Sequence, residues 1–227
     1  MRAALVVTAL VAAVALTVSA PAGATNECHG IQACIRVVGP WVVVPAHGTA
    51  QYLLTCPGGR SIVAGLDSLV TSREVHVDFT GRLGAPVGPG VTTTRYALFR
   101  AVSSSKREQF FQPLAGCVPA QGGGGRSTVS ARVSPPGPAL ELRSRIVVVA
   151  PGGVKFGRVT CRSDEQLVGS WSSTAFRTNL PPDSRSASYV RAGRVVVGKQ
   201  VVLTASATDA LSIDVHAVVQ VGAECAP

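Results

Sequence analysis

Several short segments of this chain alternate between polar and apolar residues with a period of two. Residues 74–79 and 212–217 follow this pattern strictly, and residues 194–197 and 201–203 are β-branched runs separated at Gly198. A period of two places successive side chains on opposite faces of a strand, whereas an amphipathic helix has a period of 3.6. The pattern predicts short β-strands with one buried and one wet face, and hence an all-β fold.

The strand pattern occurs twice in the chain. Residues 41–44, Trp-Val-Val-Val, align with residues 146–149, Ile-Val-Val-Val, at an offset of 105 that persists for more than twenty residues. Both copies end on Cys-x-Pro, and each has a glutamine shortly before it, Gln112 and Gln220. Such self-similarity indicates a duplicated unit.

The repeat also suggests how the cysteines pair. The six cysteines are Cys28, Cys34, Cys56, Cys117, Cys161 and Cys225. Cys56 with Cys117 and Cys161 with Cys225 are equivalent pairs, which leaves Cys28 with Cys34 as a small additional loop. We therefore expect three disulfides, as an even cysteine count in an exported chain indicates.

The fold that these features predict is two tandem β-sandwich domains of the immunoglobulin-like class, with a jelly roll or a small barrel as the alternative. The first domain spans residues 25–120 and the second residues 141–227. Residues 121–140 are rich in glycine and proline and form the expected linker. Residues 128–133 alternate, however, so an alternative interpretation makes them the first strand of the second domain.

Residues 1–24 have the features of a secretory signal peptide. Arg2 precedes a mainly apolar run over residues 3–18, and residues 22–24 are small. The alternative is an uncleaved membrane anchor, for which the apolar run is short. We expect a secreted protein, extracellular or non-covalently associated with the cell wall, with no transmembrane segment in its mature form.

Residues 56–65, Cys-Pro-Gly-Gly-Arg-Ser-Ile-Val-Ala-Gly, form a short element in which a strand ends, the chain turns and a new strand begins. The element resembles a Cys-Pro-x-Gly-x-x-x-Val-x-Gly motif of secreted actinobacterial β-rich proteins of uncharacterised activity. The second copy lacks the proline and the first glycines after Cys161. The resemblance covers about ten residues and implies an exported β-rich protein, without an activity to carry over.

The residues most suggestive of a site are Glu74, His76 and Asp78. They alternate along one predicted strand, so their side chains project from one face about 7 Å apart. Two carboxylates and an imidazole are suitable ligands for zinc or another divalent ion. The alternative is an ordinary solvated face, which we favour because the second copy has no equivalent triplet; no cofactor is expected. Asp214 and His216 form a similar pair without a defined nucleophile.

The charge and the motifs together favour binding over catalysis. The chain contains no Gly-x-Ser-x-Gly elbow, no His-Glu-x-x-His and no phosphate-binding glycine loop. Without residues 1–24 the net charge is +8, shared by both copies. A basic exported protein favours anionic partners, such as a cell-wall polymer or a membrane surface. Nucleic acid is not favoured, because aromatic residues are not interleaved with the arginines.

The sequence therefore predicts a secreted, non-enzymatic binding or structural protein that associates with an anionic cell-envelope component. The first alternative is an extracellular metal-assisted hydrolase that uses Glu74, His76 and Asp78. The second is a secreted protease inhibitor that presents a loop such as residues 84–94. The sequence gives no indication of the oligomeric state.

Overall fold

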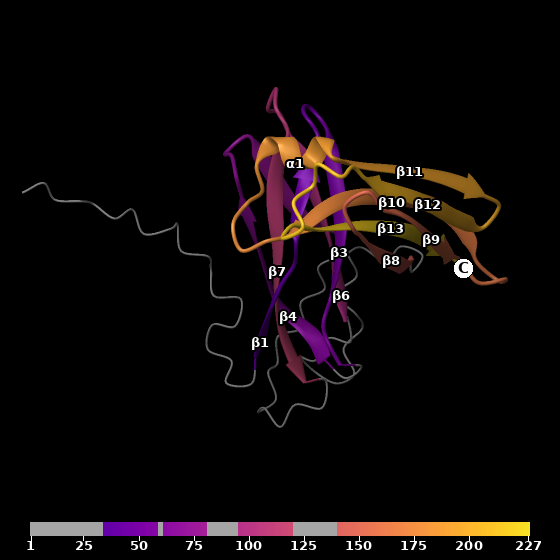
Figure 1. The fold of residues 1–227 in the computed structure, drawn as a ribbon. Helices are drawn as coiled ribbons and strands as arrows, with labels where there is room; N and C mark the ends of the chain where they lie inside the picture. Colours follow the sequence, from indigo (N-terminus) through magenta and orange to yellow (C-terminus); the bar gives the residue numbers. More distant parts are fainter. Residues whose placement is uncertain (1–33, 59–60, 81–94, 120–139) are drawn as a thin grey trace, which may run out of the picture.

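The computed structural model describes residues 34–58, 61–80, 95–119 and 140–227 (Figure 1). The first repeat contributes seven strands: β1 (Ile35–Val38), β2 (Trp41–Val44), β3 (Thr49–Thr55), β4 (Ser61–Val70), β5 (Val75–Thr80), β6 (Tyr96–Ser103) and β7 (Gln109–Pro119). The second contributes β8 (Glu141–Val149), β9 (Val154–Thr160), β10 (Gln166–Arg177), the short helix α1 (Ser184–Ser188), β11 (Val190–Val197), β12 (Gln200–Ala207) and β13 (His216–Ala226). The prediction of an all-β fold is confirmed.

The strands form one large antiparallel sheet and two small ones. The large sheet has seven strands in the order β1-β7-β2-β10-β13-β8, with β4 paired to β7 as well. Each small sheet has three strands, β3-β6-β5 from the first repeat and β11-β12-β9 from the second. Each repeat thus places its first and last strands in the large sheet and keeps a three-stranded sheet of its own, which agrees with a duplicated unit.

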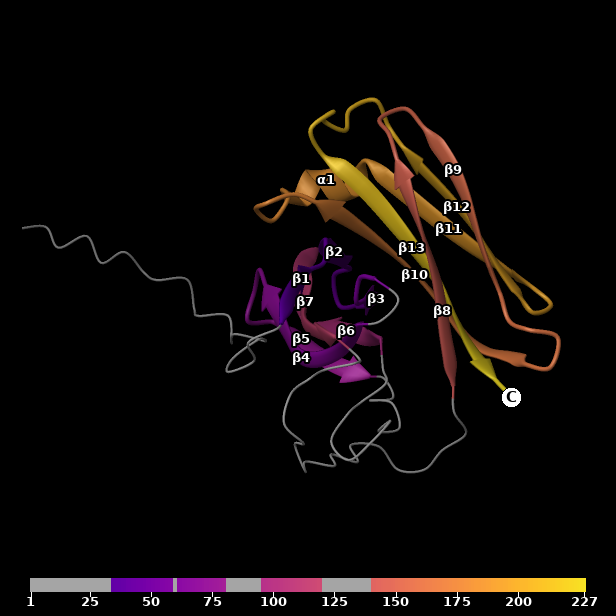
Figure 2. The ribbon, with the colours of Figure 1, turned by 90° about the horizontal axis from the view of Figure 1, so that it is seen from below.

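The large sheet is continuous across the two repeats, because β2 pairs with β10. Trp41 lies opposite Phe176 and Val42 opposite Ala175 in this pair. The expected pair of separate immunoglobulin-like sandwiches is therefore not what the structure shows. Figure 2 shows the large sheet curling from the first repeat into the second. Without this pairing, β2 and β10 would each have a free edge. The backbone hydrogen bonds between them satisfy both edges and so stabilise the contact between the repeats.

Each repeat contributes side chains to the hydrophobic core of the other. Trp41 and Phe110 of the first repeat pack in the core of the second. Ala175 and Val218 of the second repeat pack in the core of the first. β13 is consequently buried on both faces over most of its length. The two repeats therefore form one packed unit rather than two independently packed domains.

The hairpin of β11 and β12 forms where the valine runs and Gly198 predict it. The two strands are paired from Val190–Ala207 to Val197–Gln200, so a two-residue loop joins them. Gly198 has a φ of 56°, in the left-handed region that glycine adopts without a steric cost. Two-residue hairpin loops commonly require such a conformation.

The expected strand over residues 212–217 is largely wrong. Only its last two residues, from His216 onward, belong to β13. The backbone N–H of Val215 donates to the carbonyl of Ser212 at 3.0 Å, which closes a turn. The N–H of Asp214 donates to the Ser212 hydroxyl at 3.4 Å. Serine side chains favour such local turns over a strand ladder, and the alternating pattern does not reveal this competition.

Two of the expected disulfides are present. Cys56 is bonded to Cys117 and Cys161 to Cys225, each linking the end of an early strand to the last strand of the same repeat. The prediction made from the repeat is confirmed for these pairs. The third expected pair involves Cys28, which lies outside the described residues. No cysteine in the described ranges is a free thiol.

Candidate functional site

The three residues expected to bind a metal do not form a gathered site. His76 and Asp78 lie on β5, where His76 Nε2 is 3.1 Å from Asp78 Oδ1. Their side chains are 79% and 58% exposed, so solvent weakens the pair. Glu74 precedes the strand, and its backbone N–H donates to the Ser72 hydroxyl. Within the described ranges, these three are not among the groups whose ligand atoms lie close enough to share an ion.

The other sequence candidates are also scattered. Asp214 lies in the turn before β13 and His216 is exposed at the first position of that strand. His47 is exposed in the turn between β2 and β3, where its φ is 48°. The loop of residues 84–94 lies outside the described residues. None of these positions is brought to a common cavity by the described part of the chain.

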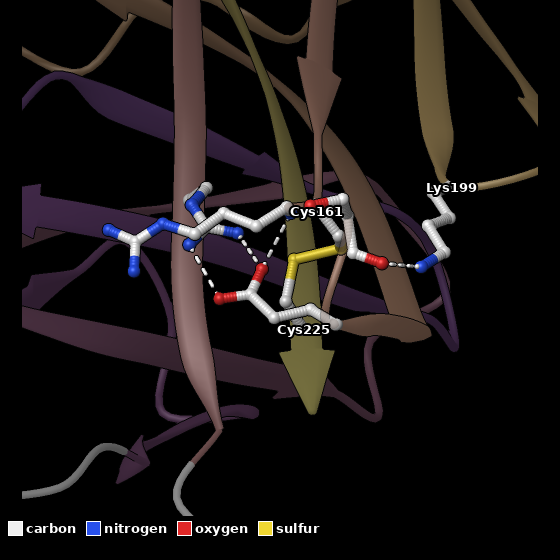
Figure 3. A network of polar contacts seen from close by, with 7 residues as sticks. Cys161, Lys199 and Cys225 are labelled. Atoms are coloured by element: carbon white, nitrogen blue, oxygen red, sulfur yellow. Dashed lines mark hydrogen bonds and ion pairs between the residues drawn. A yellow bond between two sulfur atoms is a disulfide. The ribbon is translucent and has the colours of Figure 1, made fainter. Parts of the chain in front are cut away.

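One compact polar group surrounds the second disulfide (Figure 3). Glu165 is buried and accepts from Arg143 through both carboxylate oxygens, with Nη2 to Oε1 at 2.8 Å. The backbone N–H of Arg162 donates to Oε2 of the same carboxylate at 2.7 Å. The hydrogen bonds from Arg143 lower the pKa of Glu165 to about 2. A carboxylate with these partners holds β8 against the turn that leads into β10.

The residues of this group are of the types that bind metals, but their bonding leaves them unable to do so. Cys161, Glu165 and Cys225 bring their ligand atoms within 4.8 Å of one another. The two sulfurs are bonded to each other, however, and a metal is bound by the thiolate form of cysteine. Glu165 is occupied by Arg143. The arrangement is structural.

A second group of contacts joins the two repeats. The side chain of Gln220 on β13 accepts from the N–H of Leu53 at 2.7 Å and donates to the carbonyl of Leu53 at 2.9 Å. Leu53 lies on β3, an outer strand of its small sheet, so Gln220 satisfies the two backbone groups that β6 does not reach. One amide side chain thus replaces a neighbouring strand at this point.

Trp171 completes the contact between the repeats. It is buried with Leu53 and Leu98 of the first repeat. Its indole lies over Gly222, the residue opposite it on β13, and a Cβ at Gly222 would lie 2.0 Å from the ring. The close approach of the ring therefore requires glycine. The sequence signal for this contact is the matched pair Gln112 and Gln220, which occupy corresponding positions before the last cysteine of each repeat.

A cleft lies between the repeats, beside this contact. Its volume is about 520 Å³, and its walls come from β1 and the turn after it, from β3, from β8 and from the end of β10. The lining side chains that carry polar groups are Tyr52, Gln112 and Arg177, with Thr55, Ser144, Thr178 and Asn179. The residues that line the cleft include no carboxylate. Sequence reasoning missed the cleft because it forms only where the repeats meet.

Another feature is the outer face of the β11-β12-β9 sheet, the face that points away from the core of the second repeat. Alternation and register place on it Val154, Phe156 and Arg158 of β9, Val202 and Thr204 of β12, and Arg191, Val195 and Val197 of β11. Phe156 is 71% exposed and Val195 64%. The three strands contain no acidic residue, and two of their four basic residues, Arg158 and Arg191, lie on this face. Figure 2 shows this sheet on the side of the second repeat that faces away from the first.

The chain matches no protein-family model and no curated protein sequence. The resemblance of residues 56–65 to secreted actinobacterial proteins remains a prediction. In the structure, β3 ends at Thr55 and β4 begins at Ser61, as expected for a strand, a turn and a new strand.

Proposed function

We propose that this protein is secreted, is not an enzyme, and associates with an anionic component of the cell envelope through the outer face of the β11-β12-β9 sheet. The observation that carries the proposal is the combination of exposed arginines with exposed apolar side chains on a face without carboxylates. The two disulfides support export, because such bonds persist in oxidising compartments. In the described ranges, no helix is long and apolar enough to cross a membrane.

The composition of the face favours a membrane surface over a charged polymer. Arg158 and Arg191 can bind the phosphates of lipid headgroups. These two cations alone would be enough to attract an anionic polymer, so they do not distinguish the two partners. Phe156, Val154 and Val195 add exposed apolar area, which gains free energy only when it leaves water. A surface with both features binds anionic bilayers by charge and by shallow burial of its apolar side chains.

The alternatives have less support. A metal-assisted hydrolase would need Glu74, His76 and Asp78 to converge. The described geometry brings only His76 and Asp78 together, and all three residues are exposed. A protease inhibitor would depend on residues 84–94, which lie outside the described residues. We therefore develop only the first proposal.

The test is co-sedimentation of the mature protein with vesicles of phosphatidylcholine, alone or mixed with phosphatidylglycerol. We expect retention on the anionic vesicles that falls as salt rises, because salt screens the attraction. Each surface cation contributes about 1 kcal/mol near such a membrane, so Arg158→Gln with Arg191→Gln should weaken binding roughly 30-fold. Phe156→Ser should weaken it independently of salt.

The matched control removes the same charge elsewhere. Arg107 and Arg185 are exposed and lie outside this sheet, so replacing both with glutamine should leave most of the binding intact. Retention by isolated envelopes but not by anionic vesicles would reassign the partner to a wall polymer. If neither retained the protein at low salt, or if both double variants lost binding equally, the proposed contact would be wrong.

A further inference from the structure

The cleft between the repeats has the size and shape of a ligand site. Its volume of about 520 Å³ falls in the range of roughly 300–1,000 Å³ that is usual for small-molecule pockets. It lies where the first repeat meets the second in the large sheet: β1 pairs with β7, while the next strand of the first repeat, β2, pairs with both β7 and β10. Folding of both repeats against each other therefore creates the cleft.

One wall of the cleft offers a hydrogen-bond donor without a partner. Tyr52 is 2% exposed and lines the cleft from β3. No described residue hydrogen-bonds its hydroxyl. Burial raises the pKa of Tyr52 to about 12, and the nearby charge of Arg177 acts in the opposite direction. The phenol thus stays protonated at neutral pH and can donate to a ligand. The Tyr52 hydroxyl is not among the fully buried polar atoms that lack a partner in the described residues, so it is accessible from the cleft, where a bound acceptor would take the place of water.

The charge of the cleft comes from Arg177. This residue ends β10, lies near Tyr52 and has no carboxylate partner in the described part of the chain. A guanidinium binds oxyanions through two parallel N–H groups. Gln112, which is also buried, donates through Nε2 to the carbonyl of Gly39 at 3.0 Å and so is held in place beside the cleft.

The remaining lining is aliphatic. Val37 and Val38 of β1, Leu53 and Leu54 of β3, and Ile146 of β8 contribute it. Val38 is 52% exposed and Ile146 39%, so part of this surface would lose contact with water when a ligand enters. None of the described lining side chains besides Tyr52 is aromatic, which favours an aliphatic ligand over a planar ring.

We propose that this cleft binds an aliphatic chain that ends in an oxyanion, with the oxyanion held by Arg177 and the Tyr52 hydroxyl. The chain of the ligand lies against the valine, leucine and isoleucine side chains. The oxyanion is a carboxylate, as in a fatty acid, or a phosphate, as in a lipid monoester. This site is separate from the outer face of the second repeat and does not depend on binding there.

The test is isothermal titration of the mature protein with decanoate and with decyl phosphate, below the concentrations at which they aggregate. We expect saturable binding of one ligand per chain, and the stronger of the two identifies the headgroup. Decyltrimethylammonium, which has the same chain and the opposite charge, should not bind. Acetate should bind much more weakly than decanoate, because it lacks the chain.

Three variants test the assigned residues. Arg177→Gln should weaken binding at least tenfold, and Tyr52→Phe roughly two- to tenfold, as the loss of one hydrogen bond predicts. Val38→Trp, at an exposed position, should obstruct the cleft without removing a polar group. Arg177 and Val38 are exposed, so these two variants should fold even if Tyr52→Phe is unstable.

The control is Phe156→Ser, which removes the most exposed aromatic side chain of the outer face and should not change the titration. The proposal is overturned if neither anion binds saturably, if the cationic probe binds equally well, or if Arg177→Gln binds like the natural protein. Loss of binding with Phe156→Ser would show that the probes occupy the outer face instead. Each of these results leaves the envelope-binding experiment unaffected.

Discussion

At the scale of single residues, Glu165 carries the clearest electrostatic effect. Its two oxygens accept from Arg143, and the backbone N–H of Arg162 completes the set. The folded protein therefore lowers the pKa of Glu165 to about 2, from an ordinary value of 4.5. The ion pair stabilises the fold fully above the ordinary pKa, and this contribution is lost as the pH falls from about 4.5 to about 2.

We predict that Glu165→Gln flattens the dependence of stability on pH between 2 and 4.5, because the variant has no proton to take up at this site. Urea unfolding at a series of pH values measures this. Arg143→Gln should have the same effect, since it removes the group that lowers the pKa. Arg145→Gln, an exposed change two residues further along β8, should keep the slope of the natural protein. An unchanged slope in Glu165→Gln would contradict the prediction.

The residue scale also shows where sequence reasoning reaches its limit. The pairing of Cys56 with Cys117 followed from the repeat alone, because equivalent cysteines occur in both copies. Glu165 gave no such signal, because its partner Arg143 is 22 residues away and has no counterpart pair in the first repeat. Tyr52 and Arg177 lie in different repeats, and only the packing of the repeats brings them together.

At the scale of elements, β3 is an outer strand that the protein covers with a side chain. Gln220 bonds both free backbone groups of Leu53, although 167 residues separate the two. Exposed strand edges invite pairing with other chains, and a glutamine from β13 occupies this one. The sequence pattern gives no indication that Gln220 lies beside β3.

We predict that Gln220→Leu lowers the free energy of unfolding by more than Gln112→Leu does. The first change leaves a buried N–H and a buried carbonyl of Leu53 without partners, and each such group costs about 1–3 kcal/mol. The second removes a single bond to the Gly39 carbonyl. Urea unfolding measures the difference, and amide hydrogen exchange at Leu53 should accelerate only in Gln220→Leu. Equal destabilisation by the two variants would contradict this account.

The elements also explain which expectations about strands failed. Residues 194–197 and 201–203 became the hairpin of β11 and β12, because the β-branched runs and Gly198 agree with each other. Residues 212–215 alternate equally well, yet the Ser212 side chain and carbonyl bind the following N–H groups and form a turn. Periodicity identifies a strand only where no local side chain competes for the backbone.

At the scale of the whole molecule, the two repeats share one sheet and exchange core residues. The sequence predicted the duplication, but it did not predict that the two repeats share one sheet. The strands that join them, β2 and β10, pair over only two residues each, which is too short a contact to leave a pattern in the sequence. Trp41, Phe110 and Val218 pack in the core of the opposite repeat. Separate domains on a linker, each with its own stability, are therefore not expected.

We predict a single cooperative unfolding transition in differential scanning calorimetry. A protease site inserted within residues 121–139 and cleaved should yield two fragments that migrate together in gel filtration, because β2, β10 and β13 hold them. The second repeat produced alone should be poorly soluble, since Trp171, Val218 and Gln220 would be exposed. Two resolved transitions, or fragments that separate without denaturant, would show that the repeats are independent.

The contact around Leu53 also bears on how many such units can assemble. It joins two different surfaces, the β3 side of one repeat and the outer side of β13 in the other. A contact between two different surfaces does not close on itself, so it allows further copies to be added. The position equivalent to Leu53 in the second repeat is Arg158, which is exposed. A terminal repeat needs a polar outer surface, and a guanidinium at this position supplies one. We therefore expect Arg158, one of the cations of the proposed envelope-binding face, also to oppose end-to-end addition of further copies.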